Sequence, residues 1–353
     1  MSQSLATLQT QAGATFDSSQ TLPLSFGNDA AAYEAAQTGL AIACRSHWGK
    51  IRVTDSDRLR FLHNQTTHDL QQLQPGQGCD TVFVTSTART LDLVSTYVKQ
   101  NSVLLLTSPE MQQKLIDWMD RYIFFADKVK LEDATAEIAA FSLLGPQSDR
   151  LVAQLGAPEL VGQPHASHQT VELDQAEVLV AVGSGLSSPG YTLLAAAEQA
   201  APLWQKLVEA GAVPLGEQVW QRLRIEQGRP MPGSELTAEI NPLEAGLWHA
   251  VSFEKGCYIG QETIARLNTY QGVKQQLWGI QLDREVPLQS PVMLNNEKVG
   301  LLTSLINTPA GVKGLAYIRT KAGGSGLSVT VGAASGTTVD LPFLSRGYLG
   351  SQP

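Results

Sequence analysis

Residues 253–266 bring together the side chains most able to do chemistry in this 353-residue chain. They read FEKGCYIGQETIAR, with Lys255 two positions before Cys257. Residues 260–265 are typical of the start of a helix, which would place the cysteine just before a helix N-terminus. Unpaired backbone N–H groups and aligned peptide dipoles favour negative charge there, and the lysine adds a positive charge. Both effects favour the thiolate, the form of cysteine that reacts and binds metal.

An inert buried cysteine in a glycine turn explains the same stretch equally well, because a lone cysteine is often structural. The chain has three cysteines, Cys44, Cys79 and Cys257, and no CxxC pair. This odd, widely spaced set argues against a disulfide framework and indicates a reducing compartment, which we take to be the cytoplasm. Three thiols also argue against an iron–sulfur cluster held by four cysteines of this chain.

Two carboxylates elsewhere in the chain are further candidates. Glu226 ends a predicted helix, where it could accept two parallel hydrogen bonds from a planar N–H pair such as that of an aminopyrimidinone ring. An ion pair with Arg222 or Arg229 is the alternative. Asp69 follows an apolar helix within the polar cluster HNQTTHDL, residues 63–70. It could orient or deprotonate an amine, although a simple turn aspartate is the alternative.

No metal site is expected from the histidines. His63 and His68 are five positions apart, which is a poor spacing for one helix face. His165 and His168 have a three-residue spacing that could suit a metal, but no acidic or thiol side chain is near them in the sequence. The chain also lacks the motifs GxxxxGK[ST] and HExxH, which rules out a phosphate loop or a zincin helix of the usual kind.

Composition limits the partners. The net charge of −8 and a pI near 5.3 provide no basic surface for nucleic acid or for an anionic membrane. No apolar run is long enough to span a bilayer, which takes about 20 residues. No lysine or arginine precedes Arg45, which argues against a secretory signal or a transit peptide. We therefore expect neither a nucleic-acid partner nor a membrane partner.

The elements that position these residues change in character near residue 272. Before it, strands are expected at 81–85, 91–98, 138–144, 178–182 and 191–196, and helices at 30–38, 109–125, 201–209 and 216–226, the first capped by Asp29 and stopped by Gly39. After it, short β-type runs at close spacing predict a small antiparallel barrel. These runs are residues 277–282, 291–294, 298–304 and 312–318. A domain boundary is therefore expected near residue 272.

The octapeptide KGCYIGQE, residues 255–262, resembles the signature of the YgfZ-type folate-binding proteins. These proteins are implicated in iron–sulfur cluster assembly or repair and are relatives of the glycine-cleavage T protein, an aminomethyltransferase. The resemblance runs in order over about residues 35–345. The other segments that carry it are GKIRV at 49–53, FL at 61–62, QTTHD at 65–69, PGQG at 75–78, LRIEQG at 223–228, NPLE at 241–244 and KVGLLTS at 298–304.

This resemblance implies an α+β T-protein-like fold, a three-lobed ring of two intertwined mixed α/β lobes in residues 1–272 and a C-terminal antiparallel β-barrel in 273–353. It implies tetrahydrofolate, or a one-carbon derivative, as the cofactor. Glu226 would grip the pterin, and Asp69 would lie near the reactive nitrogens. Cys257 and Lys255 match the pair that marks the YgfZ branch. The assigned catalytic residues are Cys257, Lys255 and Asp69, and the assigned cofactor-binding residues are Glu226, Asp69, Tyr258, Gln261 and Arg266.

Three functions follow from the resemblance. The first is a tetrahydrofolate-binding accessory factor for iron–sulfur cluster assembly or repair, with client or assembly proteins as partners and indirect effects on cluster-dependent enzymes such as tRNA-modifying ones. The second is a folate-dependent aminomethyltransferase or methyltransferase. The third is a binding module whose folate pocket is vestigial. An aminomethyltransferase needs no thiol, so Cys257 favours the first function, which is not that of a classical enzyme.

Overall fold

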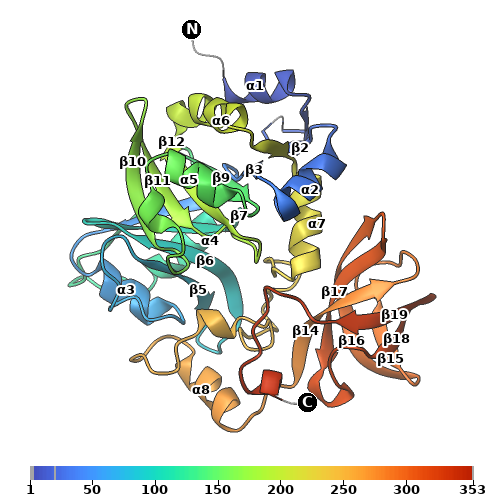
Figure 1. The fold of residues 1–353 in the computed structure, drawn as a ribbon. Helices are drawn as coiled ribbons and strands as arrows, with labels where there is room; N and C mark the ends of the chain where they lie inside the picture. The colour runs from blue at the N-terminus through green and yellow to red at the C-terminus, as the bar shows by residue number, and fades with distance from the viewer. Residues whose placement is uncertain (1–3, 20, 352–353) are drawn as a thin grey trace. The chain divides into compact units, whose positions relative to one another are not determined.

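The computed structural model describes residues 4–19 and 21–351, and the chain divides into two compact units (Figure 1). Unit 1 holds the described residues up to Leu62, together with Leu70–Asp80 and Val94–Trp220. Unit 2 holds His63–Asp69, Thr81–Leu93 and the described residues from Gln221 onward. The expected boundary near residue 272 falls inside unit 2, just before the first strand of its barrel.

Unit 1 contains a six-stranded sheet in the order β10-β11-β12-β9-β3-β13, in which β13 is parallel to β3 and the other pairs are antiparallel. Helix α6 (Ala200–Glu209) packs Leu203, Trp204 and Leu207 into the core of this sheet, because a spacing of three and four residues places them on one helix face. The strands are β3 (Ala41–Cys44), β9 (Ile138–Leu144), β10 (His168–Leu173), β11 (Ala176–Val182), β12 (Gly190–Ala196) and β13 (Val213–Leu215). The other elements here are α1 (Leu5–Gln11), β1 (Thr15–Phe16), β2 (Pro23–Ser25), α2 (Asp29–Thr38) and α5 (Ser148–Gln154).

A second sheet has the order β5-β6-β7-β4-β8. Helix α3 and strand β5 continue from unit 1 into unit 2, and strand β6 returns from unit 2 into unit 1, so the chain passes between the units several times. These strands are mostly buried on both faces, which is why they read as near-continuous apolar runs. The elements are β4 (Trp48–Thr54), α3 (Arg58–Gln65), β5 (Gly78–Val84), β6 (Thr90–Val98), β7 (Ser102–Pro109), α4 (Gln112–Asp120) and β8 (Lys130–Asp133).

Three expected helix boundaries in unit 1 are wrong. The helix predicted to begin at Pro109 begins at Gln112, because Pro109 ends strand β7. The helix predicted to reach Phe125 ends at Asp120, because the backbone N–H of Phe124 turns to donate to the carboxylate of Asp127 at 2.9 Å. The predicted cap Asp29 is instead the first residue of α2. Its carboxylate accepts from the hydroxyl of Ser25 at 2.7 Å, so the carboxylate is engaged outside the helix.

Unit 2 contains a closed antiparallel barrel in the order β14-β17-β16-β15-β18-β19, and β19 pairs back with β14. The expected α+β class and C-terminal barrel are confirmed. Gly314 lets the barrel strands approach closely, since a Cβ there would lie 2.6 Å from the carbonyl oxygen of Ser304. The strands are β14 (Gln275–Leu282), β15 (Pro291–Leu294), β16 (Glu297–Thr308), β17 (Gly311–Arg319), β18 (Ser328–Val331) and β19 (Ala334–Val339).

Two helices in this part of the chain carry candidate residues. Helix α7 (Glu217–Gln227) continues from unit 1 into unit 2, and α8 (Gln261–Thr269) begins directly after Gly260, as predicted.

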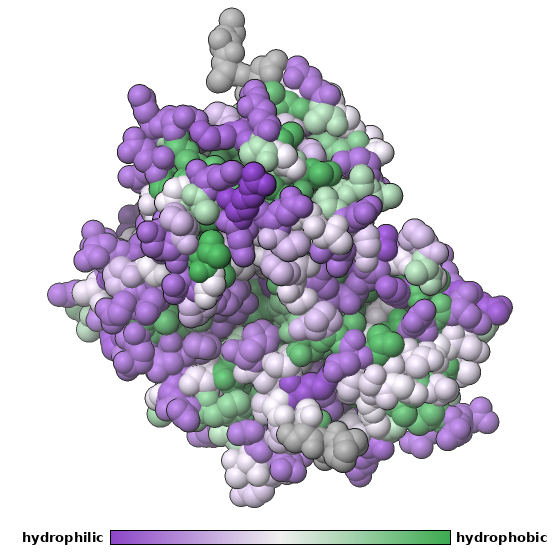
Figure 2. All heavy atoms as spheres, in the orientation of Figure 1, coloured by the Kyte–Doolittle hydropathy of each residue, from purple (hydrophilic) through white to green (hydrophobic). Residues whose placement is uncertain are grey.

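On the face drawn in Figure 2, hydrophilic side chains predominate and hydrophobic ones form smaller groups between them. None of the helices in residues 4–19 and 21–351 is long and apolar enough to cross a membrane.

Candidate functional site

Lys255 is a buried lysine of unit 2 whose ammonium group is bound by backbone carbonyls. Its Nζ donates to the carbonyl oxygens of His63 at 2.6 Å, Thr66 at 2.7 Å and His68 at 2.7 Å. An ammonium group has three hydrogens to donate, so these bonds match its capacity. The side chain assigned to activating Cys257 is thus engaged in holding the 63–69 loop.

Further bonds join the same two segments, residues 63–69 and 250–260. The hydroxyl of Thr67 donates to the carbonyl of Ala250 at 2.6 Å, and the N–H of Ser252 donates to the carbonyl of Thr67 at 2.9 Å. The N–H of Ile259 donates to the carbonyl of Asn64 at 3.0 Å. The KGC segment and the loop that carries Asp69 are therefore held together along their lengths.

Asp69 lies beside a buried histidine. Its Oδ1 is 3.0 Å from Nδ1 of His63, and the two side chains are 28% and 4% exposed. Burial lowers the pKa of His63, the nearby ammonium of Lys255 lowers it further, and Asp69 opposes both effects. His63 is therefore neutral at neutral pH and can accept a proton. Sequence analysis had treated this histidine only as a non-ligand.

Cys257 lies at the surface of unit 2 with a free thiol. Among the residues that the structure describes, no hydrogen bond to its sulfur is found. The three residues that separate it from the first residue of α8 end at Gly260, whose φ of 81° is unfavourable for other residues. A Cβ at Gly260 would lie 2.7 Å from the carbonyl oxygen of Thr85, so the glycine seats this segment on the β5–β6 turn. The thiol is accessible, which excludes the buried-cysteine alternative.

The remaining residues assigned to this stretch differ in their surroundings. The ring of Tyr258 is buried, and Nζ of Lys255 lies 4.6 Å from its centroid, a cation–π distance. Burial raises the pKa of this tyrosine well above its usual range. Gln261 is the first residue of α8, where its N–H donates to the carbonyl of Tyr258 at 3.2 Å. Arg266 is exposed near the end of the same helix.

Glu226 lies elsewhere in unit 2, in the last turn of α7. Its side chain is 8% exposed, and its Oε1 is 3.2 Å from Nε of Arg222 and 3.0 Å from Nζ of Lys313 on β17. The alternative of an ion pair with Arg222 is thus realised, but in a buried rather than a surface setting. Both contacts pair the carboxylate with a cationic group, which compensates its charge in this buried setting.

Two buried carboxylates of unit 2 were not singled out from the sequence. Glu235 is fully buried and accepts from Ser304 at 2.6 Å, Arg224 at 3.3 Å and the N–H of Met231 at 3.1 Å. Asp92 on β6 is also fully buried. The only sequence signal was an acidic residue inside an apolar run, TLDLV, which is unusual for a buried strand.

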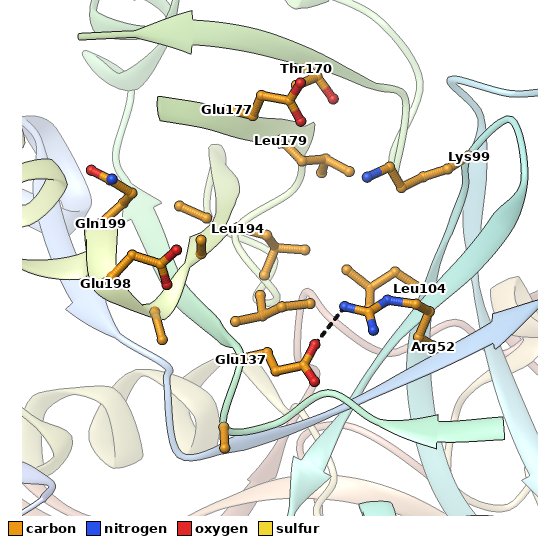
Figure 3. A pocket seen from close by; sticks show the side chains of 15 residues that line it. Arg52, Lys99, Leu104, Glu137, Thr170, Glu177, Leu179, Leu194, Glu198 and Gln199 are labelled. Atoms are coloured by element: carbon orange, nitrogen blue, oxygen red, sulfur yellow. Dashed lines mark hydrogen bonds and ion pairs between the residues drawn. The ribbon is translucent and has the colours of Figure 1, made fainter. Parts of the chain in front are cut away.

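A separate pocket of about 550 Å³ lies in unit 1 and contains none of the assigned residues. The leucines Leu104, Leu179 and Leu194 line the middle of the pocket in the view of Figure 3, and charged side chains surround them. Arg52 is paired there with Glu137 at 2.9 Å. Across the described chain, no group of three or more His, Cys, Asp or Glu side chains is placed to hold a metal ion.

Comparison with known proteins places these residues in context. Residues 8–255 match the family model described as the GCVT N-terminal domain. A chloroplastic protein of Arabidopsis thaliana that bears the name "Putative transferase At1g60990" is 45% identical over 327 residues, covering 92% of this chain and 76% of the relative. An aminomethyltransferase of Geobacillus kaustophilus is 30% identical over 340 residues, covering 92% of this chain and 93% of the relative.

The fold also has a solved counterpart. The crystal structure of the glycine cleavage system aminomethyltransferase T from Bartonella henselae superposes with a TM-score of 0.84 and covers 98% of both chains. The sequences are 19% identical, so this likeness concerns the fold. It extends over the mixed α/β part and the C-terminal barrel alike.

Proposed function

Because the chain belongs to the GCVT N-terminal domain family, we propose that it binds tetrahydrofolate or a one-carbon derivative and acts as an accessory factor in iron–sulfur cluster assembly or repair. In this proposal the chain is of the YgfZ type, its partners are cluster-carrying client or assembly proteins, and its effects on tRNA-modifying enzymes are indirect. It works in a reducing compartment, the cytoplasm, where Cys257 stays a free thiol.

The observation that carries the proposal is the accessible thiol of Cys257 on a segment that Lys255 fastens to the Asp69 loop. A thiol has no part in transferring an aminomethyl group to folate, since the amine and the methylene carrier both come with the substrates. An exposed cysteine on a segment bonded to the Asp69 loop suits transient bonding to sulfur, to a cluster or to a client protein.

Glu226 provides the test of folate binding. We expect the affinity for tetrahydrofolate, measured by titration calorimetry, to fall about tenfold or more in Glu226→Gln, since charge-assisted hydrogen bonds contribute roughly 1.5–3 kcal/mol. Glu262→Gln on the exposed side of α8 is the matched control. No saturable binding by the wild type, or equal binding by both variants, favours a module with a vestigial pocket.

Cys257 provides the test of the cluster role. We expect Cys257→Ala to bind tetrahydrofolate normally but to fail to restore cluster-dependent enzyme activity in cells that lack this protein. Full restoration by this variant removes the thiol from the proposal.

The second candidate function is a tetrahydrofolate-dependent aminomethyltransferase, which the aminomethyltransferase relative at 30% identity favours. Turnover of an aminomethyl-lipoyl donor by the purified wild-type protein, and its persistence in Cys257→Ala, would establish that function in place of the first.

A further inference from the structure

We propose that His63 is the proton acceptor for the Cys257 thiol and that Asp69 acts through His63. This inference rests on the proposed function for the reactivity of Cys257. It changes the role expected of Asp69, from a group that meets folate directly to one that orients an imidazole.

The first step in the argument is the tautomer of His63. An ionised carboxylate only accepts hydrogen bonds, so Oδ1 of Asp69 at 3.0 Å requires the hydrogen of neutral His63 to lie on Nδ1. The other ring nitrogen, Nε2, then carries a lone pair. His63 is 3% exposed, and within the described residues Nε2 has no hydrogen-bond partner. A ring nitrogen with its lone pair available is ready to accept a proton.

The second step is the direction in which Nε2 points. A Cβ built on Gly256 would lie 3.5 Å from Nε2, so the open nitrogen faces the backbone one residue before Cys257. Glycine leaves this approach open. The side chain of the next residue, Cys257, is exposed, so in this proposal its proton passes to Nε2 after rotation of the side chain or through one water. The absence of a side chain at Gly256 thus leaves space between Nε2 of His63, the proton acceptor, and the thiol of Cys257, the proton donor.

The third step concerns charge. Two charged groups face His63: Asp69 from its own loop, and Lys255 from the segment packed against that loop. When the S–H bond breaks and the Nε2–H bond forms, the total charge of the pair does not change. Asp69 stabilises the imidazolium, and the imidazolium in turn stabilises the thiolate. The ammonium of Lys255 stays in place because three carbonyls hold it.

The test is the pH profile of Cys257 alkylation by iodoacetamide, followed on the intact chain by peptide mass spectrometry from about pH 5.5 to 9.5. The thiolate displaces iodide and forms a thioether, so the rate reports the thiolate. We expect His63→Gln to lower the rate at pH 7 by roughly three- to tenfold and to move the midpoint of the profile up by about one pH unit. We expect Asp69→Asn to shift it in the same direction by less.

His249→Gln is the matched control, because this histidine also lies in unit 2 but its ring is bonded to Ser345 at 2.9 Å. We expect its profile to match the wild type. Buried Cys79 reports the fold in the same spectra, since it reacts only when the chain opens. Coinciding profiles for wild type and folded His63→Gln overturn the proposal.

If His63→Gln exposes Cys79, the decision falls to Asp69→Asn, which keeps the imidazole but removes its orienting carboxylate. An unchanged profile in that variant also overturns the proposal. All rates are measured without folate, and tetrahydrofolate titration of the same proteins is separate. A loss of folate binding and an unchanged alkylation profile therefore identify different failures.

Discussion

Each unit of this protein contains a buried lysine bound by backbone carbonyls, and the two lysines differ in how far along the chain their partners lie. In unit 1, Nζ of Lys50 donates to the carbonyls of Ser46 at 2.7 Å and Trp48 at 2.8 Å, both within four residues. In unit 2, Nζ of Lys255 donates to carbonyls that lie 187 to 192 positions earlier in the chain. The first lysine closes a local turn, whereas the second joins distant segments.

Their surroundings differ as well. Near Lys50, Cζ of Arg45 lies 3.2 Å and 3.8 Å from the ring centroids of Trp48 and Trp220, two rings that are nearly perpendicular and both contact the guanidinium. Near Lys255, the exposed thiol of Cys257 lies two residues further along the chain, and Nε2 of His63 faces the intervening Gly256. A lysine bound by backbone carbonyls therefore lies among packed side chains in unit 1, whereas in unit 2 it lies near an accessible thiol.

Removing the long-range lysine is the strongest way to test this comparison. We expect Lys255→Met to lower the free energy of unfolding by about 3 kcal/mol or more, because three buried carbonyls lose their donor at roughly 1–3 kcal/mol each. Urea unfolding followed by tryptophan fluorescence measures this. Exposed Lys321→Met is the control and should change stability by less than about 0.5 kcal/mol. A loss no greater than the control's would contradict the role assigned to Lys255.

The local lysine should matter less. We expect Lys50→Met to cost about 2 kcal/mol, because two carbonyls rather than three lose a donor. The same urea experiment measures it, and the reactivity of Cys257 should stay at its wild-type rate. A larger loss than in Lys255→Met would reverse the order of the two sites.

The smallest expected effect is one of pH in unit 1. Burial first, and then the positive charges of Arg45 and Lys50, lower the pKa of His47 to about 3. A carboxylate oxygen of Glu217, 3.9 Å from its Nε2, is too distant to offset the burial. The pKa of His47 is lower in the folded chain than its unfolded value of about 6.5. The neutral ring therefore contributes its full stabilisation above pH 6.5, and this contribution is lost as the pH falls toward 3.

We therefore expect the wild type to lose about 1–2 kcal/mol more than His47→Gln between pH 7 and pH 5, at roughly 1.4 kcal/mol per pH unit. Urea unfolding at the two pH values measures the difference. Parallel losses in the two proteins would show that His47 is not held neutral in the folded state.

Local signals predicted the parts of the fold that depend on near neighbours. Gly260 followed by helix formers predicted the start of α8, and apolar runs separated by turn residues predicted the barrel. Strands β18 and β19 were missed, because they are short and partly polar and gain their stability from pairing with each other and with distant strands.

The candidate site was predictable in its residue types but not in its connections. Cys257, Lys255 and Asp69 stood out by their chemistry, whereas His63 did not. The dyad it forms with Asp69 joins residues six positions apart through the turn at the end of α3, which no helical or strand spacing would suggest.

The sequence by itself determined the barrel and the reactive residue types through local pattern, and it implied the α+β class through its likeness to a known family. Only the tertiary structure decided that Lys255 is engaged with the loop of Asp69 and that His63 presents an open nitrogen to Gly256. The physical reason is that the partners of Lys255 are backbone carbonyls, which every residue carries, and the contact of Gly256 is with a side chain far away in the chain. Neither kind of contact produces a residue type or a spacing that could be recognised in the sequence.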